Sequence, residues 1–227
     1  MTEKVLLITG ASSGIGAATA KAAAAKGWRV ALAARSAANL DALVGEIGPD
    51  KALAIPCDVT RMDDVEAALA ATLDKFGRLD AAFANAGLGA SAVGTEGGDP
   101  ANWRAMIDVN IWGLLLTAKI CLPALKESKG HFVMTGSRAG VATMKGSVYG
   151  ATKWFVRGYA ANLREEMAEW GGRCTLIAPG MVDTPFFDEP KPQGLSAEDV
   201  ARAVLYALEQ PDTVNINEML LTPNTAA

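Results

Sequence analysis

The sequence is poor in residues on which several classes of protein depend. Its single histidine, His131, begins a predicted strand, where we expect a surface or strand-edge position. Its three cysteines, Cys57, Cys121 and Cys174, lie far apart and form no C-x-x-C pair, so neither a disulfide framework nor a zinc site is indicated. We therefore expect no metal, reduced and inert thiols, and a cytoplasmic protein.

Long runs of like charge and long apolar runs are also missing. The 21 basic and 25 acidic side chains give a net charge of −4 and are scattered, which argues against binding to nucleic acid or anionic lipid. The longest apolar stretch, residues 111–125, is interrupted by Lys119 and Pro123 and is shorter than the ~20 apolar residues of a membrane span. No signal-peptide pattern precedes Val5. We expect neither nucleic acid nor a membrane as a partner.

The sequence does contain a regular alternation of short aliphatic runs and longer amphipathic segments. This alternation predicts an α/β fold, a single doubly wound domain over residues 1–227 with about seven mostly parallel strands and helices on both faces. The expected strands are residues 4–9, 29–34, 52–57, 79–84, 131–135, 174–178 and 215–221, and the expected helices are 14–26, 37–45, 62–76, 100–108, 111–126, 147–169 and 197–209.

Ligands of such folds bind beyond the carboxyl ends of the strands, so the loops at those ends are candidate walls of the site. Two of these loops are rich in glycine and proline, namely residues 87–100 and 179–194. The second contains the polar, proline-broken segment 188–192. We expect it to form a short substrate lid near residues 185–197.

A glycine-rich segment closes the first predicted strand and opens an alanine-rich helix. Glycine lets the backbone turn tightly and lets a pyrophosphate approach, and the helix N-terminus offers free N–H groups to the anion. The spacing G-x-x-x-G-x-G differs from the commoner G-x-G-x-x-G and lacks the Lys-Ser/Thr ending of a P-loop. The alternative is a glycine turn with no ligand. We predict that a dinucleotide contacts Gly10, Ser12, Ser13, Gly14, Ile15 and Gly16.

Residues at the ends of the second and third strands bear on the choice of cofactor. A carboxylate there would accept from the ribose 2′-hydroxyl of NAD, but this chain has Arg35, whose guanidinium suits a 2′-phosphate. We therefore expect NADP(H) to be preferred over NAD(H), unless Arg35 is only a solvated charge. Asp58 is placed to accept from the adenine amino group and Val59 to offer an apolar wall and a backbone N–H. Alternatively, Asp58 or Thr60 caps the following helix.

The segment after the fourth strand puts Asn85, Ala86 and Gly87 at the edge of the expected crevice. An asparagine in that position either contacts ligand or ties neighbouring strands together. We include all three residues among the expected cofactor contacts.

Tyr149 and Lys153 form a pair at i, i+4 spacing, which stacks phenol and ammonium on one helix face. Attraction between the ammonium and a phenolate predicts a lowered tyrosine pKa and hence a usable proton donor. Ser137, at the end of the fifth strand, can donate a hydrogen bond to a substrate oxygen. Thr135 and Ser147 are fallback hydroxyls for that role.

Taken in order along the chain, these motifs resemble the short-chain dehydrogenase/reductase family over essentially the whole sequence. The resemblance rests on the glycine loop, Asn85-Ala86-Gly87, Asn110, Ser137, Tyr149 with Lys153, and Pro179-Gly180 followed by Thr184. It implies a Rossmann fold and an NADP(H)-dependent oxidoreductase that interconverts a secondary alcohol and a ketone or aldehyde. It also implies a homodimer or homotetramer, with the predicted helices 111–126 and 147–169 at the interface.

The resemblance also assigns roles to individual residues. Tyr149 would exchange the proton with the substrate, Lys153 would hold the nicotinamide ribose, Ser137 would orient the carbonyl, and Asn110 would hold a water of the proton relay. The nicotinamide carboxamide would be fixed by the segment that contains Pro179, Gly180, Val182 and Thr184. The ending at 214–219 is similar to NADP-dependent 3-hydroxy acid dehydrogenases.

Three features depart from the family pattern. Ala84 stands where the family often has a first asparagine, the spacing between Ser137 and Tyr149 is one residue shorter than is common, and the segment after Thr184 is compact. The compact segment favours small or medium substrates. The alternative function is an NADP(H)-binding redox sensor or scaffold without turnover, which would not need a proton relay. A methyltransferase would not need the tyrosine and lysine pair.

Overall fold

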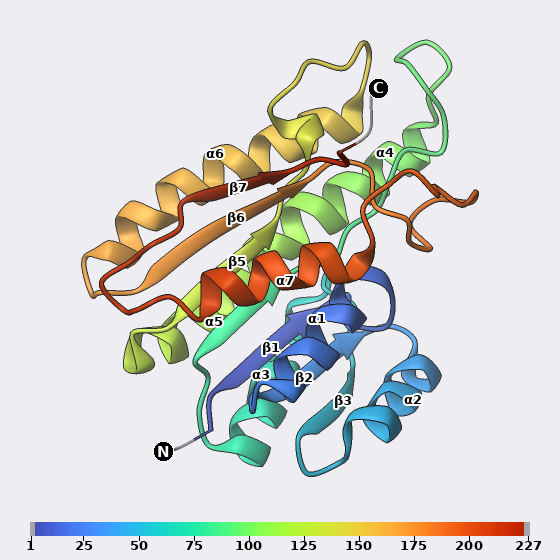
Figure 1. Ribbon diagram of the computed structural model, residues 1–227. Helices are drawn as coiled ribbons and strands as arrows, with labels where there is room; N and C mark the ends of the chain where they lie inside the picture. The colour runs from blue at the N-terminus through green and yellow to red at the C-terminus, as the bar shows by residue number, and fades with distance from the viewer. Residues whose placement is uncertain (1–2, 225–227) are drawn as a thin grey trace.

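Seven parallel strands form one sheet in the order β3-β2-β1-β4-β5-β6-β7, with helices on both faces (Figure 1). The computed structural model describes residues 3–224, so the ends of the predicted domain, 1–2 and 225–227, lie outside the described residues. The predicted fold class is confirmed. The strands are β1 (Val5–Thr9), β2 (Arg29–Ala34), β3 (Ala52–Pro56), β4 (Ala81–Ala84), β5 (His131–Thr135), β6 (Arg173–Pro179) and β7 (Glu218–Leu221). The α-helices are α1 (Gly14–Ala25), α2 (Ala37–Ile47), α3 (Met62–Phe76), α4 (Pro100–Ile107), α5 (Leu114–Ser128), α6 (Val148–Ala168) and α7 (Ala197–Leu208).

Strands β1 to β6 send alternate side chains into two separate cores. Leu7 of β1 belongs to the core covered by α3, α5 and α6, whereas Leu6 and Ile8 belong to the core covered by α1, α2 and α7. Every residue of β1 and β6 is buried. Strands covered on both faces are mostly apolar, which is why the sequence shows them as nearly continuous apolar runs.

Small side chains allow helix α1 to pack close to the sheet and to α7. Ala20, Ala23 and Ala24 are buried and belong to the core between this helix, α7 and the sheet. Because alanine adds little bulk, α1 lies close to its neighbours, and its N-terminus follows directly from the glycine loop. The composition of this helix thus fixes where its first N–H groups lie.

The helices predicted at 100–108 and 111–126 form one continuous helix, Pro100–Ser128, and here the prediction was wrong. A π-helical segment, Asp108–Gly113, joins α4 to α5, so the chain does not leave the helix at Asn110. The resulting helix is, among the described residues, the one that is long and apolar enough by length and composition to cross a bilayer. Several of its residues are buried in the core beside the sheet, and core helices meet the same criterion.

His131 also differs from expectation, because it is buried rather than at a surface or strand edge. It begins β5, which lies between β4 and β6 inside the sheet, and only 1% of the residue is exposed. Its Nε2 lies 2.7 Å from Thr175 Oγ1, which itself donates to the carbonyl of Ile216 at 2.6 Å. Nδ1 of His131 has no hydrogen-bond partner among the described residues. Burial and the charges of Arg173 and Lys4 lower the pKa of the imidazole to about 3.

Candidate active site

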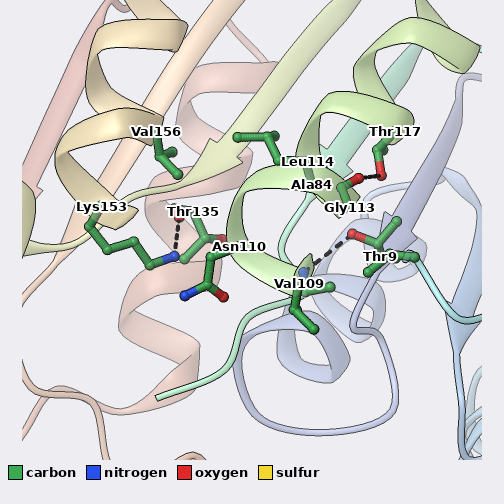
Figure 2. Close-up of a pocket in the computed structure, with 12 residues that line it drawn as sticks. Thr9, Ala84, Val109, Asn110, Gly113, Leu114, Thr117, Thr135, Lys153 and Val156 are labelled. Atoms are coloured by element: carbon green, nitrogen blue, oxygen red, sulfur yellow. Dashed lines mark hydrogen bonds between the residues drawn. The ribbon is translucent and has the colours of Figure 1, made fainter. Parts of the chain in front are cut away.

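Predicted site residues from six strands converge on one edge of the sheet. Because all the strands are parallel, their carboxyl ends share that edge. These ends are followed by Gly10, Arg35, Asp58, Asn85, Ser137 and Gly180, in the order of β1 to β6. The strand order reverses between β1 and β4, and a small pocket lies there, lined by Thr9, Ala84, Asn110, Thr135 and Lys153 among others (Figure 2). This is the position at which open α/β sheets bind ligands.

The glycine loop needs glycine for two different physical reasons. Gly10 and Gly14 have φ angles of +64° and +52°, which side chains rarely allow. At Gly16 the reason is space, because a Cβ there would lie 2.3 Å from the carbonyl oxygen of Gly10. The loop therefore folds back on the first turn of α1.

The same turn fits a dinucleotide phosphate. Ser13 is the N-cap residue of α1, yet its side chain makes no capping hydrogen bond, and the first turn of the helix contains no acidic residue. The first N–H groups and the positive end of the helix dipole therefore face no side-chain acceptor or negative charge of the helix itself. Ser12, Ser13 and Ile15, three of the expected cofactor contacts, lie in this turn.

Asn85 holds the glycine loop against the sheet. Its Nδ2 donates to the carbonyls of Thr9 and Gly10, both at 3.2 Å, and its Oδ1 accepts from Thr135 Oγ1 at 3.0 Å. The side chain of Asn85 is therefore committed to joining β1, β4 and β5, which is the second of its two predicted roles. Ala86 packs against Gly10, where an added Cβ would lie 2.8 Å from Ala86 Cα.

Arg35 and Asp58 stand where the adenosine end of a dinucleotide would lie. Arg35 is exposed and makes no hydrogen bond or ion pair with any residue that the structure describes, so its guanidinium is available to a ligand. The alternative considered for Asp58 and Thr60, that one of them caps α3, is wrong. Arg61 occupies the N-cap position, and Asp58 Oδ1 instead accepts from the N–H and the hydroxyl of Thr60, at 3.0 and 2.8 Å. Val59 is buried and packs close to Gly113.

Tyr149, Lys153 and Ser137 meet at the start of α6. The side chain of Ser137 lies close enough to the Tyr149 phenol to lower the pKa of that phenol. Lys153 Nζ lies 5.8 Å from the centroid of the Tyr149 ring. The same Nζ donates to the carbonyl of Thr135 at 2.8 Å (Figure 2). Thr135 also bonds Asn85, so a short chain of hydrogen bonds connects the lysine to the glycine loop.

The predicted lowering of the tyrosine pKa was wrong for this arrangement. Burial raises the pKa of Tyr149 above its usual value of 10, and the nearby side chain of Ser137 offsets this only in part. Burial also lowers the pKa of Lys153 to about 8. Desolvation decides both shifts, because Lys153 is buried and Tyr149 is partly buried, and burial disfavours the charged form of each group.

The two fallback hydroxyls have other tasks. Thr135 Oγ1 donates to Asn85, and Ser147 Oγ accepts from Gly150 N at 2.9 Å as the N-cap of α6. Ser137 Oγ accepts from Ala139 N at 3.1 Å and contacts Tyr149. Ser137 is therefore the hydroxyl best placed to act beside the phenol.

Asn110 lies inside the π-helical segment and is buried. Its Oδ1 accepts from Leu88 N at 2.8 Å, and its Nδ2 donates to Leu88 O at 2.9 Å and to Thr152 Oγ1 at 3.1 Å. These bonds join the loop after β4, the long helix and α6 beside Lys153. The extra residue of a π turn is what turns this side chain toward the pocket.

The chain matches the family model described as short chain dehydrogenase over residues 4–193. The glycine turn, Asn85, Asn110, Ser137, Tyr149 and Lys153 all lie in that span. The protein belongs to the short-chain dehydrogenase family.

Individual relatives extend this likeness to almost the whole length. An uncharacterized oxidoreductase of Staphylococcus saprophyticus is 39% identical, over 98% of each chain. A 3-ketoacyl-(acyl-carrier-protein) reductase of Brucella melitensis, complexed with NADH, superposes with a TM-score of 0.90 at 30% identity, over 97% of each chain. The closed form of serine dehydrogenase, complexed with NADP+, superposes with a TM-score of 0.91 at 30% identity, over 98% of this chain and 96% of that one.

The segment after β6 lies against the glycine turn of this dehydrogenase. Gly180 N donates to Leu221 O at 2.7 Å, and Val182 is buried and forms a β-bridge with Leu195. The side chain of Thr184 lies 3.2 Å from the point that a Cβ on Gly14 would occupy. The fold thus brings together two segments predicted to bind the cofactor, around Gly14 and Thr184, which lie 170 residues apart in the sequence.

Sequence reasoning missed three residues of this dehydrogenase site. Thr9 Oγ1 accepts from Asn85 N at 3.1 Å, and Thr152 links Asn110 to α6. Phe186, in the predicted lid, has its ring centroid 5.8 Å from that of Tyr149. Thr9 could have been found as the last residue of a strand before the glycine turn, whereas no local pattern marks Phe186.

Proposed function

We propose that this dehydrogenase is an NADP(H)-dependent oxidoreductase that interconverts a secondary alcohol and a ketone or aldehyde, with Tyr149 as the general acid and base. The observation that carries the proposal is the position of Tyr149 next to the buried Lys153, whose Nζ lies 5.8 Å from the centroid of the tyrosine ring and is linked through Thr135 and Asn85 to the glycine turn. A binding protein without turnover has no use for such a proton donor.

The residues of the chain divide the reaction between them. When bound, the nicotinamide supplies or accepts the hydride. Tyr149 donates its hydroxyl proton to the carbonyl oxygen in reduction and takes the proton back in oxidation. Ser137 donates a hydrogen bond to the same oxygen, on which negative charge develops. The Lys153 ammonium favours the phenolate that remains after the proton has left.

The preference for NADP(H) over NAD(H) rests on Arg35. Relatives of this fold are complexed with either dinucleotide, so the fold does not decide the choice. The support comes from an exposed guanidinium, free of partners among the described residues, at the end of β2, which can bind a 2′-phosphate bidentately.

Arg35→Ala tests this cofactor preference. The substitution should weaken NADPH binding by about tenfold or more, the effect of losing a charge-assisted hydrogen bond, and should change NADH binding little. Both dissociation constants are measured by titration calorimetry. Equal losses for the two dinucleotides would show that Arg35 does not contact a 2′-phosphate.

The activity itself is tested by mixing the full chain with NADPH and a panel of carbonyl compounds while following NADPH absorbance. Oxidation of NADPH that depends on a carbonyl compound supports the proposal. Tight NADPH binding without turnover over a broad panel would favour the sensor or scaffold.

We also propose that the enzyme works in the cytoplasm as a homodimer or homotetramer on a small alcohol or carbonyl substrate, with residues 185–197 as its lid. Three buried free cysteines support a reducing compartment. Ile107 and Trp112 on the long helix, and Trp154 and Phe155 on α6, leave 38–49% of their surface exposed, which supports a partner subunit there. Light scattering of the purified protein measures the oligomeric mass.

A further inference from the structure

The lid segment between β6 and α7 is closed at its base. Val182 and Leu195 form a parallel β-bridge, Asp183 N donates to Leu195 O, and Leu195 N donates to Met181 O, both at 2.8 Å. These bonds hold the two ends of the loop side by side. The residues between them form a compact loop whose contacts with the rest of the molecule decide where it lies.

Phe186 is the residue through which this loop reaches the reacting phenol. Its ring lies 5.8 Å from that of Tyr149, centroid to centroid, at an interplanar angle of 54°. The ring of Phe187 packs edge-on against Phe186 at 5.2 Å, and Lys191 Nζ lies 5.5 Å from the Phe187 centroid. Phe186 nevertheless keeps 41% of its surface exposed, so part of the ring is open to a ligand.

Gly89 provides the space for this ring on the opposite loop. A Cβ on Gly89 would lie 2.9 Å from Phe186 Cζ and 3.1 Å from Cε1. The φ angle of Gly89 is not positive, so the backbone itself does not require glycine. The carbonyl of Gly89 accepts from Asn102 Nδ2 at 3.1 Å, and Asn102 Oδ1 accepts from Ser91 N at 3.0 Å, which ties the loop to α4. Glycine is therefore required at position 89 because any side chain there would collide with the ring of Phe186.

We infer that Phe186 determines substrate specificity, and that its ring, seated between Tyr149 and Gly89, selects carbonyl compounds with a flat apolar substituent, such as aryl ketones. The inference rests on the proposed function, because proton exchange at Tyr149 fixes where the substrate oxygen lies. A carbonyl that approaches this phenol brings its substituents to the ring packed beside it. Burying an apolar substituent against an aromatic face is favourable, whereas a small hydroxy acid offers Phe186 little apolar surface.

The test compares the reduction of acetophenone with that of butan-2-one by the full chain at saturating NADPH. The wild type should favour acetophenone in kcat/KM, and Phe186→Ala should lower the ratio of the two kcat/KM values by about tenfold, mainly through the KM of acetophenone. Phe186→Tyr keeps the ring and should keep the ratio. Thermal denaturation should show that the Phe186→Ala variant keeps the melting temperature of the wild type. If this folded variant has the same ratio of kcat/KM values as the wild type, the inference is overturned.

Gly89→Ala provides an independent arm of the experiment. Its Cβ displaces the ring, so it should lower the ratio as Phe186→Ala does, and it should have no further effect once Phe186 is alanine. Gly97→Ala is the matched control in the same loop, since a Cβ there meets nothing closer than Val93 O at 3.4 Å. If the two substitutions together lower the ratio by the product of their separate effects, Gly89 and Phe186 do not act through the same contact.

The proposed function and the specificity inference fail in different ways. A wild type that reduces no carbonyl compound contradicts the proposed function and, with it, the inference. A wild type that reduces ketones with a ratio insensitive to both Phe186 and Gly89 contradicts the inference alone.

Discussion

At the scale of single residues, the chemistry depends on a phenol whose surroundings stabilise its neutral form. Burial raises the pKa of Tyr149, and Ser137 offsets this only in part. The proton is thus retained until a stronger acceptor, such as the oxygen of a carbonyl under reduction, lies against the hydroxyl. The nearby Lys153, with a pKa of about 8, then gives the remaining phenolate a positive neighbour.

Tyr149→Phe should remove most turnover and keep dinucleotide binding. General acid catalysis contributes about 100-fold to 10,000-fold, so the loss of the hydroxyl should lower kcat at least about 100-fold. Stopped-flow measurement of NADPH oxidation gives the rate, and calorimetry gives the affinity. A rate near that of the wild type would mean that another group donates the proton.

At the scale of elements, the glycine turn and helix α1 act as one unit. The carbonyl oxygen of Gly10 lies only 2.3 Å from the point that a Cβ on Gly16 would occupy, and Asn85 donates a hydrogen bond to the same carbonyl from the neighbouring strand. Neither partner can give way easily, because Gly10 is backbone and Asn85 is bonded on both sides of its amide.

Gly16→Ala should therefore open the turn, lower the melting temperature and weaken NADPH binding by about tenfold or more, as expected for overpacking that costs about 1–3 kcal/mol. Gly45→Ala is the control, since a Cβ on Gly45 in α2 meets nothing within 4 Å. That change should raise stability by about 0.5–1 kcal/mol, the gain of alanine over glycine in a helix. Calorimetry and thermal denaturation measure both effects, and normal binding by the Gly16 variant would refute the tight turn.

Elements with a strong local signal could be predicted from the sequence. The bounds of β2, β5 and α3 agree with their predicted ranges. A run of apolar residues marks a buried strand and apolar residues at helical spacing mark a helix, and both patterns can be read from neighbouring residues in the sequence. The π-helical segment, the burial of His131 and the contact between Phe186 and Gly89 could not be predicted. Each of these features depends on which residues far apart in the sequence pack together, and no local sequence pattern indicates those contacts.

At the scale of the whole molecule, His131 couples stability to pH. Its folded-state pKa of about 3 lies below the usual 6.5, so the folded protein binds fewer protons than the unfolded chain between these values. The free energy of unfolding should therefore be at its full value above about pH 6.5 and fall as the pH drops toward 3.

His131→Gln should flatten this dependence on pH. A glutamine can still reach Thr175, but it takes up no proton, so the loss of stability between pH 6.5 and 4 should be smaller by a few kcal/mol, given about 1.4 kcal/mol per pKa unit. Urea denaturation of both proteins across that range measures the difference. Identical slopes would mean that His131 is not buried in the neutral form.

Asn85 is hydrogen-bonded to Thr9, which lies 76 positions before it in the chain, and to Thr135, which lies 50 positions after it. During synthesis, the first strand and its turn are therefore complete long before the residues that brace them have left the ribosome. β1 gains its second neighbour when β4 is made, but until β5 follows, β4 itself has no neighbour on its other side. Unpaired strand edges of this kind make partly folded chains prone to aggregation, which chaperones counter. The capacity to bind a dinucleotide should appear late and abruptly as the chain lengthens, and no N-terminal fragment ending before β5 should acquire it.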